Sequence, residues 1–271
     1  MSIQPIHSKQ MPATAVACLA LRLVAVTWLA PCFVVGCDSP RTLNNNAPIL
    51  LFDGTGTSAS DVFAFESLLN DQHLEFTRVN SDELNRMSVS EIRNHRLLIV
   101  PGGHYINMGS GLSADCTRNV RDAVHEGLNY LGVCAGGLLA GDATCNSFNL
   151  TSGVRFDFYA VVNQGIHKAP VWIDIAESIP QEHYWEDGPH FSGWGDVIAM
   201  YPDKTPAIVE GKHGKGWIIL CGVHPEAPEK WREGMDFTTS ARVENDFADQ
   251  LIEAALNAVP QPHHQTSSRS Q

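Results

Sequence analysis

Four short apolar runs constrain the fold of this chain most strongly, because each has the length of one buried strand and ends in residues that stop it. They are PILLFD (48–53), RLLIVPGG (96–103), NYLGV (129–133) and GWIILCGVHPE (216–226). Continuous apolar runs, as opposed to alternating ones, are typical of strands that are covered on both faces of a parallel sheet.

The segments between and after these runs have the apolar spacing of helices or the composition of strands and loops. Residues 59–71, 113–127 and 241–256 have helical apolar spacing, and residues 149–210 are rich in aromatic and turn residues, which indicates strands and loops. Strands that alternate with helices predict an α/β fold. We therefore expect a single flavodoxin-like three-layer domain, with a mostly parallel sheet and helices on both faces, over residues 48–259.

The N-terminal segment differs in kind from this domain. Residues 1–36 have a charged start and a long apolar middle, which is typical of a secretory signal, and they end at Cys37 in the sequence VVGC, which resembles a bacterial lipobox. In such signals the cysteine becomes the lipid-carrying N-terminus. The alternative is an uncleaved transmembrane anchor. Both interpretations place the domain outside the cytoplasm, beside a membrane, on a polar tether (37–47), and the tail (260–271) is predicted to be disordered.

Charge and cysteine content exclude some classes of function. The chain has 30 acidic and 18 basic residues, a formal net charge of −12, and its acids are scattered, which argues against nucleic acid as a partner. Of the seven cysteines, two lie in the signal (Cys18 and Cys32), and a Cys116–Cys145 disulfide remains open. The histidines His167, His183 and His213 lack the spacing of metal ligands, so neither a metal nor a cofactor is expected.

One cysteine stands between two glycines where a strand is expected to become a helix. The sequence GVCAG (132–136) is the thiol form of the Gly-x-Ser-x-Gly nucleophile elbow. Gly132 and Gly136 would remove side chains that clash with a strained turn, and the helix N-terminus would favour a Cys134 thiolate. The alternative is a buried structural cysteine with glycines used for tight packing.

The other two strand ends supply partners for such a nucleophile. His224 follows the last apolar run directly and could serve as the base, while Glu226 could hold the imidazole in the required tautomer. The Pro-Gly-Gly turn lets the main chain approach a developing oxyanion, so we expect the Gly103 and Ala135 N–H groups to form an oxyanion hole. Taken singly, each feature is also compatible with an ordinary turn.

The motifs LLIVPGG, LGVCAGG and GVHPE, in this order and spacing, resemble the class I glutamine amidotransferase superfamily. Residues 129–141 and 188–226 are most similar to the amidotransferase-like domain at the N-terminus of eukaryotic biotin–protein ligases and in stand-alone bacterial proteins. The resemblance covers most of residues 48–256. It implies a Cys134 nucleophile in a triad with His224 and Glu226, but it carries over no substrate.

Four further residues are predicted to line the pocket: Gly102, His104, Tyr105 and His190. The resulting hypothesis is a thiol-dependent hydrolase or acyl transferase that acts on a small-molecule or peptide amide or ester through a Cys134 thioester. Two other interpretations stay open, a non-catalytic binding or accessory module with the same fold, and a redox role for Cys134.

Overall fold

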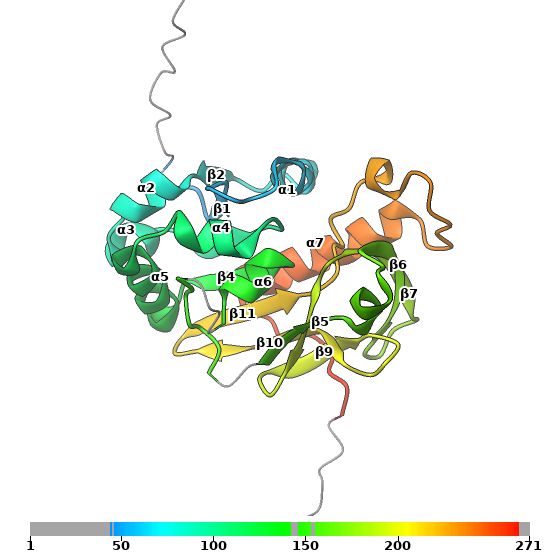
Figure 1. Cartoon of the computed structure of the whole chain (residues 1–271). Coiled ribbons are helices and arrows are strands. Elements are labelled where there is room, and N and C mark those ends of the chain that lie inside the picture. The colour runs from blue at the N-terminus through cyan, green and yellow to red at the C-terminus, as the bar shows by residue number, and fades with distance from the viewer. Residues whose placement is uncertain (1–43, 45, 142–145, 153–154, 266–271) are drawn as a thin grey trace, which may run out of the picture. The chain divides into compact units, whose positions relative to one another are not determined.

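The computed structural model describes residues 44, 46–141, 146–152 and 155–265 (Figure 1). A nine-stranded sheet in this part of the chain has the order β2-β1-β3-β4-β11-β10-β9-β6-β7, and a small second sheet pairs β5 with β8. The strands are β1 (Ile49–Phe52), β2 (Phe76–Val79), β3 (Leu97–Val100), β4 (Asn129–Val133), β5 (Arg155–Phe158), β6 (Lys168–Ile175), β7 (Gln181–Glu186), β8 (Pro189–Ser192), β9 (Asp196–Met200), β10 (Pro206–His213) and β11 (Gly216–Cys221).

The four apolar runs of the sequence form neighbouring parallel strands. β1 pairs in parallel with β2 and β3, β3 with β4, and β4 with β11. From β11 onward the sheet continues with antiparallel strands, which come from the aromatic-rich middle of the chain. The two kinds of pairing meet at β11, so this strand is buried along its whole length.

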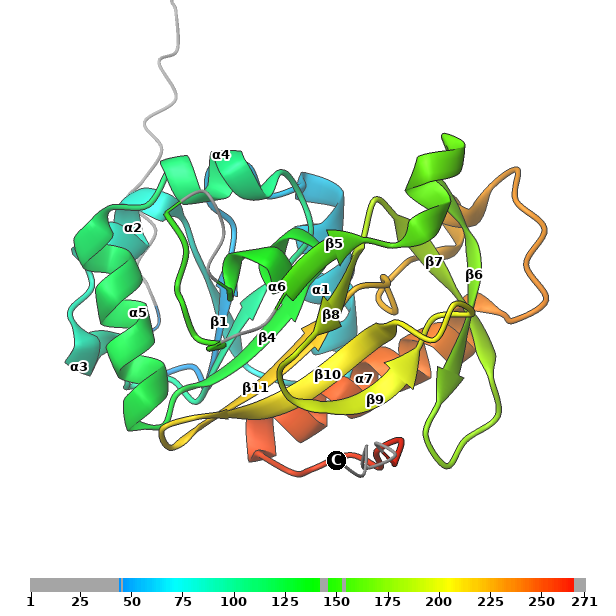
Figure 2. The same ribbon diagram turned by 60° about the horizontal axis from the view of Figure 1, so that its bottom comes forward.

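Helices cover both faces of the sheet, as predicted. They are α1 (Ala59–Asp71), α2 (Ser81–Arg86), α3 (Val89–Ile92), α4 (Tyr105–Ser110), α5 (Ala114–Glu126), α6 (Ala135–Leu139) and α7 (Ala241–Asn257), with 3-10 turns η1 (Ala160–Gln164) and η2 (Glu229–Arg232). Successive residues of a strand point to opposite faces. Ile49 and Leu51 therefore pack with α1 and α7, whereas Leu50 and Phe52 pack with α2 to α6. Figure 2 shows α6 and α7 on opposite sides of the sheet.

The beginning of the predicted tail is ordered, contrary to the expectation of disorder from residue 260. The Gln261 N–H and His263 Nε2 contact the Oε1 atom of Glu210 at 2.7 and 2.6 Å, and His264 donates its N–H to the carbonyl of Val197 at 2.8 Å. Glu210 is fully buried, so its carboxylate needs hydrogen-bond partners, and the tail provides two of them.

The predicted signal, the lipidation candidate Cys37 and most of the tether lie outside the described residues. Among the residues that are described, no helix is both long and apolar enough to cross a membrane.

Candidate active site

Three neighbouring parallel strands end at one edge of the sheet, and each is followed by a residue singled out in the sequence. β3 leads into Pro101–Gly103, β4 into Cys134, and β11 into the segment that holds His224. The register pairs Val100 with Gly132 and Cys221 with Val133, so the three chain segments leave the sheet at the same level. In such sheets, ligands gather at the carboxyl ends of the strands.

Cys134 has the strained backbone of a nucleophile elbow. Its φ and ψ are 49° and −109°, a conformation that costs energy for a residue with a side chain. A Cβ on Gly132 would lie 2.5 Å from the Gly136 carbonyl oxygen, and one on Gly136 would lie 1.9 Å from the Val100 carbonyl oxygen. Both glycines are therefore required at this turn, for the steric reason that the sequence predicted.

His224 is fixed from several directions beside this turn. Its N–H donates to the Tyr184 carbonyl at 2.8 Å, and its ring packs against the rings of Tyr184 and Trp231, each with a centroid 5.9 Å away. Its Nδ1 atom lies 2.8 Å from Oε1 of Glu226, and both side chains are buried. This contact occupies Nδ1 and leaves Nε2 as the ring nitrogen available to a thiol.

The electrostatics of the group favour a protonated imidazole. Burial by itself lowers the pKa of His224. The charges of Glu226 and Cys134, and the hydrogen bonds that the ring makes with Asp61 and Cys134, have a larger effect in the opposite direction, so the pKa lies well above its ordinary value. Burial raises the pKa of Glu226, although its attraction to His224 opposes this change. The Cys134 thiol also lies 3.7 Å from the Glu186 carbonyl oxygen, to which it can donate.

The glycine turn after β3 leaves a main-chain amide unused. Ser58 donates its N–H to the Gly102 carbonyl and His104 donates to the Gly56 carbonyl, at 3.0 and 2.8 Å. These two bonds flank Gly103, whose own N–H has no backbone acceptor in the described part of the chain. Ala135 is the first residue of α6, so its N–H has no acceptor within the helix. Gly103 and Ala135 line the same cavity.

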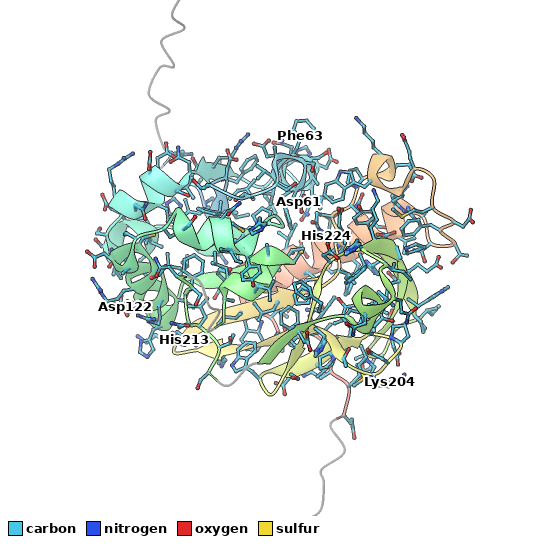
Figure 3. All side chains as sticks on the ribbon, viewed as in Figure 1. Asp61, Phe63, Asp122, Lys204, His213 and His224 are labelled. Atoms are coloured by element: carbon cyan, nitrogen blue, oxygen red, sulfur yellow. The ribbon has the colours of Figure 1, made fainter. Side chains whose placement is uncertain are left out.

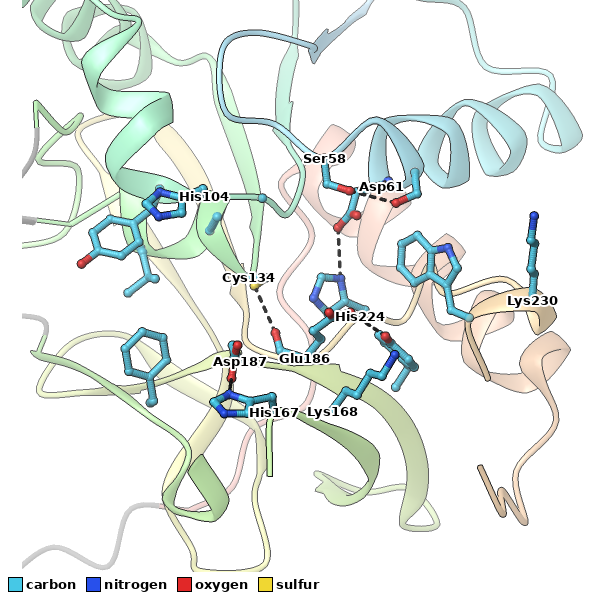
Figure 4. A pocket seen from close by; sticks show the side chains of 18 of the residues that line it. Ser58, Asp61, His104, Cys134, His167, Lys168, Glu186, Asp187, His224 and Lys230 are labelled. Atoms are coloured by element: carbon cyan, nitrogen blue, oxygen red, sulfur yellow. Dashed lines mark hydrogen bonds and ion pairs between the residues drawn. The ribbon is translucent and has the colours of Figure 1, made fainter. Parts of the chain in front are cut away.

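That cavity has a volume of about 840 Å³ and opens to solvent (Figure 4). Six of the residues singled out in the sequence line it: Gly103, His104, Tyr105, Cys134, Ala135 and His224. Its wall also includes residues that sequence reasoning did not identify, which are Ser58, Ser60, Asp61, Leu138, Phe158, His167, Lys168, Tyr184, Glu186, Asp187, Lys230, Trp231 and Glu233. The cavity wall is thus aromatic and mixed in charge.

Two pocket predictions need correction. His190 does not line the cavity, because β8 pairs with β5 and its neighbour Phe191 takes the core-facing position, where it would meet a Cβ on Gly137. Gly102 lies behind the wall: a Cβ there would be 2.2 Å from Oδ1 of Asp61 and 2.8 Å from Cε1 of His224.

The other two described cysteines, Cys116 and Cys221, do not line the cavity. Cys116 is a free, buried thiol, and Cys145 lies outside the described residues. Cys221 is free and buried at the end of β11, and its thiol donates to the Val223 carbonyl at 3.2 Å.

Asp61 is the functional candidate that sequence reasoning missed. It is buried in the first turn of α1, and Oδ1 lies 3.3 Å from Nδ1 of His224. With Glu226, these two residues form one buried group around Nδ1 of His224. The only sequence signal was its place three residues after the N-cap Ser58, which is ordinary for an acid at a helix start.

The fold of this α/β domain is similar to that of glutamine amidotransferases. One solved structure, a glutamine amidotransferase, superimposes with a TM-score of 0.55 at 18% identity, covering 78% of this chain and 100% of the other. A glutamine amidotransferase from Thermotoga maritima gives a TM-score of 0.52 at 11% identity, over 78% of this chain and 98% of the other. At these identities the likeness concerns the fold.

The sequence comparisons are more specific. Residues 47–152 match the family described as "Biotin-protein ligase, N terminal". The biotin–protein ligase of Schizosaccharomyces pombe is 27% identical over 164 residues, which cover 48% of this chain and 25% of the yeast protein. The chain thus matches about a quarter of that ligase's length. Part of this chain is therefore similar to the N-terminal region of biotin–protein ligases, and its fold is similar to that of glutamine amidotransferases.

Proposed function

We propose that this protein is a thiol-dependent hydrolase or acyl transferase that acts on a small-molecule or peptide amide or ester. The observation that carries the proposal is the strained Cys134 at the edge of an open cavity, beside the buried His224–Glu226 pair. A non-catalytic module would not need a positive φ at a cysteine or a histidine held by a buried carboxylate.

In the first half of the reaction, the Cys134 thiolate attacks the substrate carbonyl carbon and forms a C–S bond. The negative charge that develops on the carbonyl oxygen faces the Gly103 and Ala135 N–H groups, and such donors contribute about 3 kcal/mol each in known enzymes. Protonated His224 gives its proton to the leaving amine or alkoxide as the C–N or C–O bond breaks, which leaves a Cys134 thioester.

In the second half, neutral His224 takes a proton from water or from an acceptor amine, which attacks the thioester carbonyl. The C–S bond breaks, the acyl product leaves, and the proton on His224 restores the imidazolium–thiolate pair. Glu226 holds the ring in one tautomer throughout both steps and stabilises its positive charge.

Trapping of the acyl-enzyme tests this proposal directly. The protein is exposed to a panel of small amides, esters and short peptides, quenched in acid, and analysed by peptide mass spectrometry. We expect an acyl mass on the peptide that contains Cys134, and its complete loss in Cys134→Ala. Absence of any adduct, with ligand binding unchanged in Cys134→Ala, would favour the binding module, and an oxidised Cys134 in protein isolated without reductant would favour the redox role.

We also propose that the chain is exported and anchored in the membrane by lipid on Cys37, as its first 37 residues suggest. Metabolic labelling with a radioactive fatty acid should label the full-length protein and not its Cys37→Ala variant. Equal labelling of both proteins would contradict the lipid anchor, and recovery of unprocessed chain in the membrane fraction would favour the uncleaved transmembrane anchor.

A further inference from the structure

Two carboxylates contact the same nitrogen of His224. Oε1 of Glu226 lies 2.8 Å from Nδ1, and Oδ1 of Asp61 lies 3.3 Å from it. The Asp61 side chain is 9% exposed and belongs to the cavity wall, whereas that of Glu226 is completely buried. Figures 3 and 4 show Asp61 reaching from α1 toward His224, which comes from the far side of the cavity.

The start of α1 explains why the Asp61 carboxylate points at His224. In α2 and α3, the acid three residues after the N-cap accepts a hydrogen bond from the N-cap N–H, so that Glu83 binds back to Asn80 and Glu91 to Ser88. In α1 the N–H of Ser58 donates instead to the Gly102 carbonyl at 3.0 Å. Asp61 therefore does not accept the N-cap hydrogen bond that Glu83 and Glu91 accept, and its carboxylate can turn toward His224.

Gly102 provides the space for this contact. A Cβ at that position would lie 2.2 Å from Oδ1 of Asp61 and 2.8 Å from Cε1 of His224. The first glycine of the Pro-Gly-Gly turn is thus needed to let the carboxylate and the imidazole meet, in addition to any role of the turn in binding an oxyanion.

Charge distinguishes the two carboxylates. Burial tends to raise the pKa of Asp61, but the hydrogen bond and the charge of His224 outweigh it, so the pKa is lowered. The first turn of α1 also favours an ionised Asp61, while burial raises the pKa of Glu226. The other titratable groups that face His224 are the Cys134 thiol and the Tyr184 phenol, and burial keeps the phenol neutral by raising its pKa.

We propose that Asp61 is a positioning residue that, together with Glu226, holds the His224 ring toward Cys134 and supports the positive charge that the ring carries during the reaction. This inference rests on the proposed function for its purpose. Its test does not, because alkylation of a thiol needs no acyl substrate.

The experiment measures the rate of Cys134 alkylation by iodoacetamide from pH 5 to pH 10, followed by peptide mass mapping, in wild type and Asp61→Asn. Without Asp61 the imidazolium is less stable, so we expect about ten-fold slower alkylation at pH 6, the consequence of a shift of about one pH unit in the profile. The two rates should converge near pH 10. The matched control is Asp82→Asn, which removes an exposed acid from the first turn of α2 and should leave the profile unchanged.

A second variant guards against misfolding of Asp61→Asn. Gly102→Ala keeps the aspartate, but its Cβ would press on both Oδ1 of Asp61 and Cε1 of His224 and so break their contact, and the profile should move in the same direction. The inference is wrong if the profiles of both variants coincide with that of wild type. A shifted profile in a protein that forms no acyl-enzyme would contradict the proposed function alone, and acyl-enzyme formation with an unshifted profile would contradict the role of Asp61 alone.

Discussion

Nδ1 of His224 lies 2.8 Å from Oε1 of Glu226, and the two side chains are only 5% and 0% exposed. Because so little solvent reaches this pair, its charge state depends on its protein neighbours much more than on surface screening. The pair therefore gives the site a pH dependence that can be measured.

Replacement of Glu226 by Gln should slow turnover and change its pH range. Glu226 raises the pKa of His224, and loss of the charge lowers it. Since His224 must be protonated when the leaving group departs, the alkaline limb of the kcat/KM profile should move to lower pH, with kcat reduced on the order of 10²- to 10⁴-fold. Steady-state kinetics on any substrate found by trapping measures both effects, and an unmoved alkaline limb would remove Glu226 from the mechanism.

Cys134 should be alkylated long before Cys116. Burial raises the pKa of Cys116 to about 12, so almost none of its thiol is ionised at pH 6 to 7. Limited treatment with iodoacetamide followed by peptide mapping should modify Cys134 by at least a hundred-fold over Cys116. Comparable labelling of the two in folded protein would mean that Cys134 is an ordinary thiol.

Gly136→Ala should disrupt the elbow. The Cβ of the new alanine would lie 1.9 Å from the Val100 carbonyl oxygen, a main-chain atom that can move only with β3. Ordinary overpacking costs about 1–3 kcal/mol, and we expect a destabilisation of at least that size. Gly165→Ala is the control, since its Cβ would meet nothing within 4 Å, and only its positive φ of 76° opposes a side chain there. That variant should lose only about 1–2 kcal/mol. Chemical denaturation gives both values, and equal losses would show that steric conflict is not the reason for Gly136.

His183 should make the fold sensitive to acid. Burial lowers its pKa to about 3, with a smaller effect from Arg232, and neither ring nitrogen has a hydrogen-bond partner among the described residues. The unfolded chain protonates His183 below its ordinary value near 6.5 while the folded chain does not. Stability is thus fully present above pH 6.5 and falls by about 1.4 kcal/mol per pH unit down to about pH 3.

Denaturation at several pH values should show a flatter acid side for His183→Leu than for wild type. The control is His73→Asn, at an exposed position whose positive φ an asparagine tolerates, and it should follow wild type. Parallel curves for wild type and His183→Leu would contradict the assignment.

His263→Ala should weaken the attachment of the C-terminal segment. His263 and the Gln261 N–H both contact Oε1 of Glu210, which is completely buried beside Trp217. Loss of one partner of a buried carboxylate costs about 1–3 kcal/mol, so the free energy of unfolding should fall by that amount. Gln265→Ala, which changes an exposed side chain on the same segment, should have no effect. If Glu210→Gln abolishes the cost of His263→Ala, the contact is its source.

The parts of the site that sequence reasoning identified are those governed by neighbours in the chain. A cysteine between glycines at a strand end implies a turn whatever the rest of the molecule does, and His224 lies two residues from the acid that binds it. The apolar runs likewise predict buried parallel strands, because strands that are covered on both faces of a sheet are apolar throughout.

The parts that were missed depend on contacts across the fold. Asp61 contacts the ring of His224, 163 positions later in the chain, because the Ser58 N–H that would usually bind such an acid donates to the Gly102 carbonyl instead. His190 was assigned to the pocket, but which residue of a short strand faces the core depends on its pairing partner, here β5. The order of residues 261–264 follows from a buried carboxylate on β10, which no local pattern in the tail reveals.

The strand order has a consequence for how such a domain can change. β4 and β11 lie side by side although the chain makes a long excursion between them, and that excursion builds β5 to β10, including the cavity wall around His167 and Lys168. The reactive thiol and its base follow the two flanking strands, and β7 of the excursion contacts both of them through the main-chain carbonyls of Glu186 and Tyr184. Replacement of other parts of the excursion can therefore change specificity, whereas β7 has to be kept for the chemistry at the two strand ends.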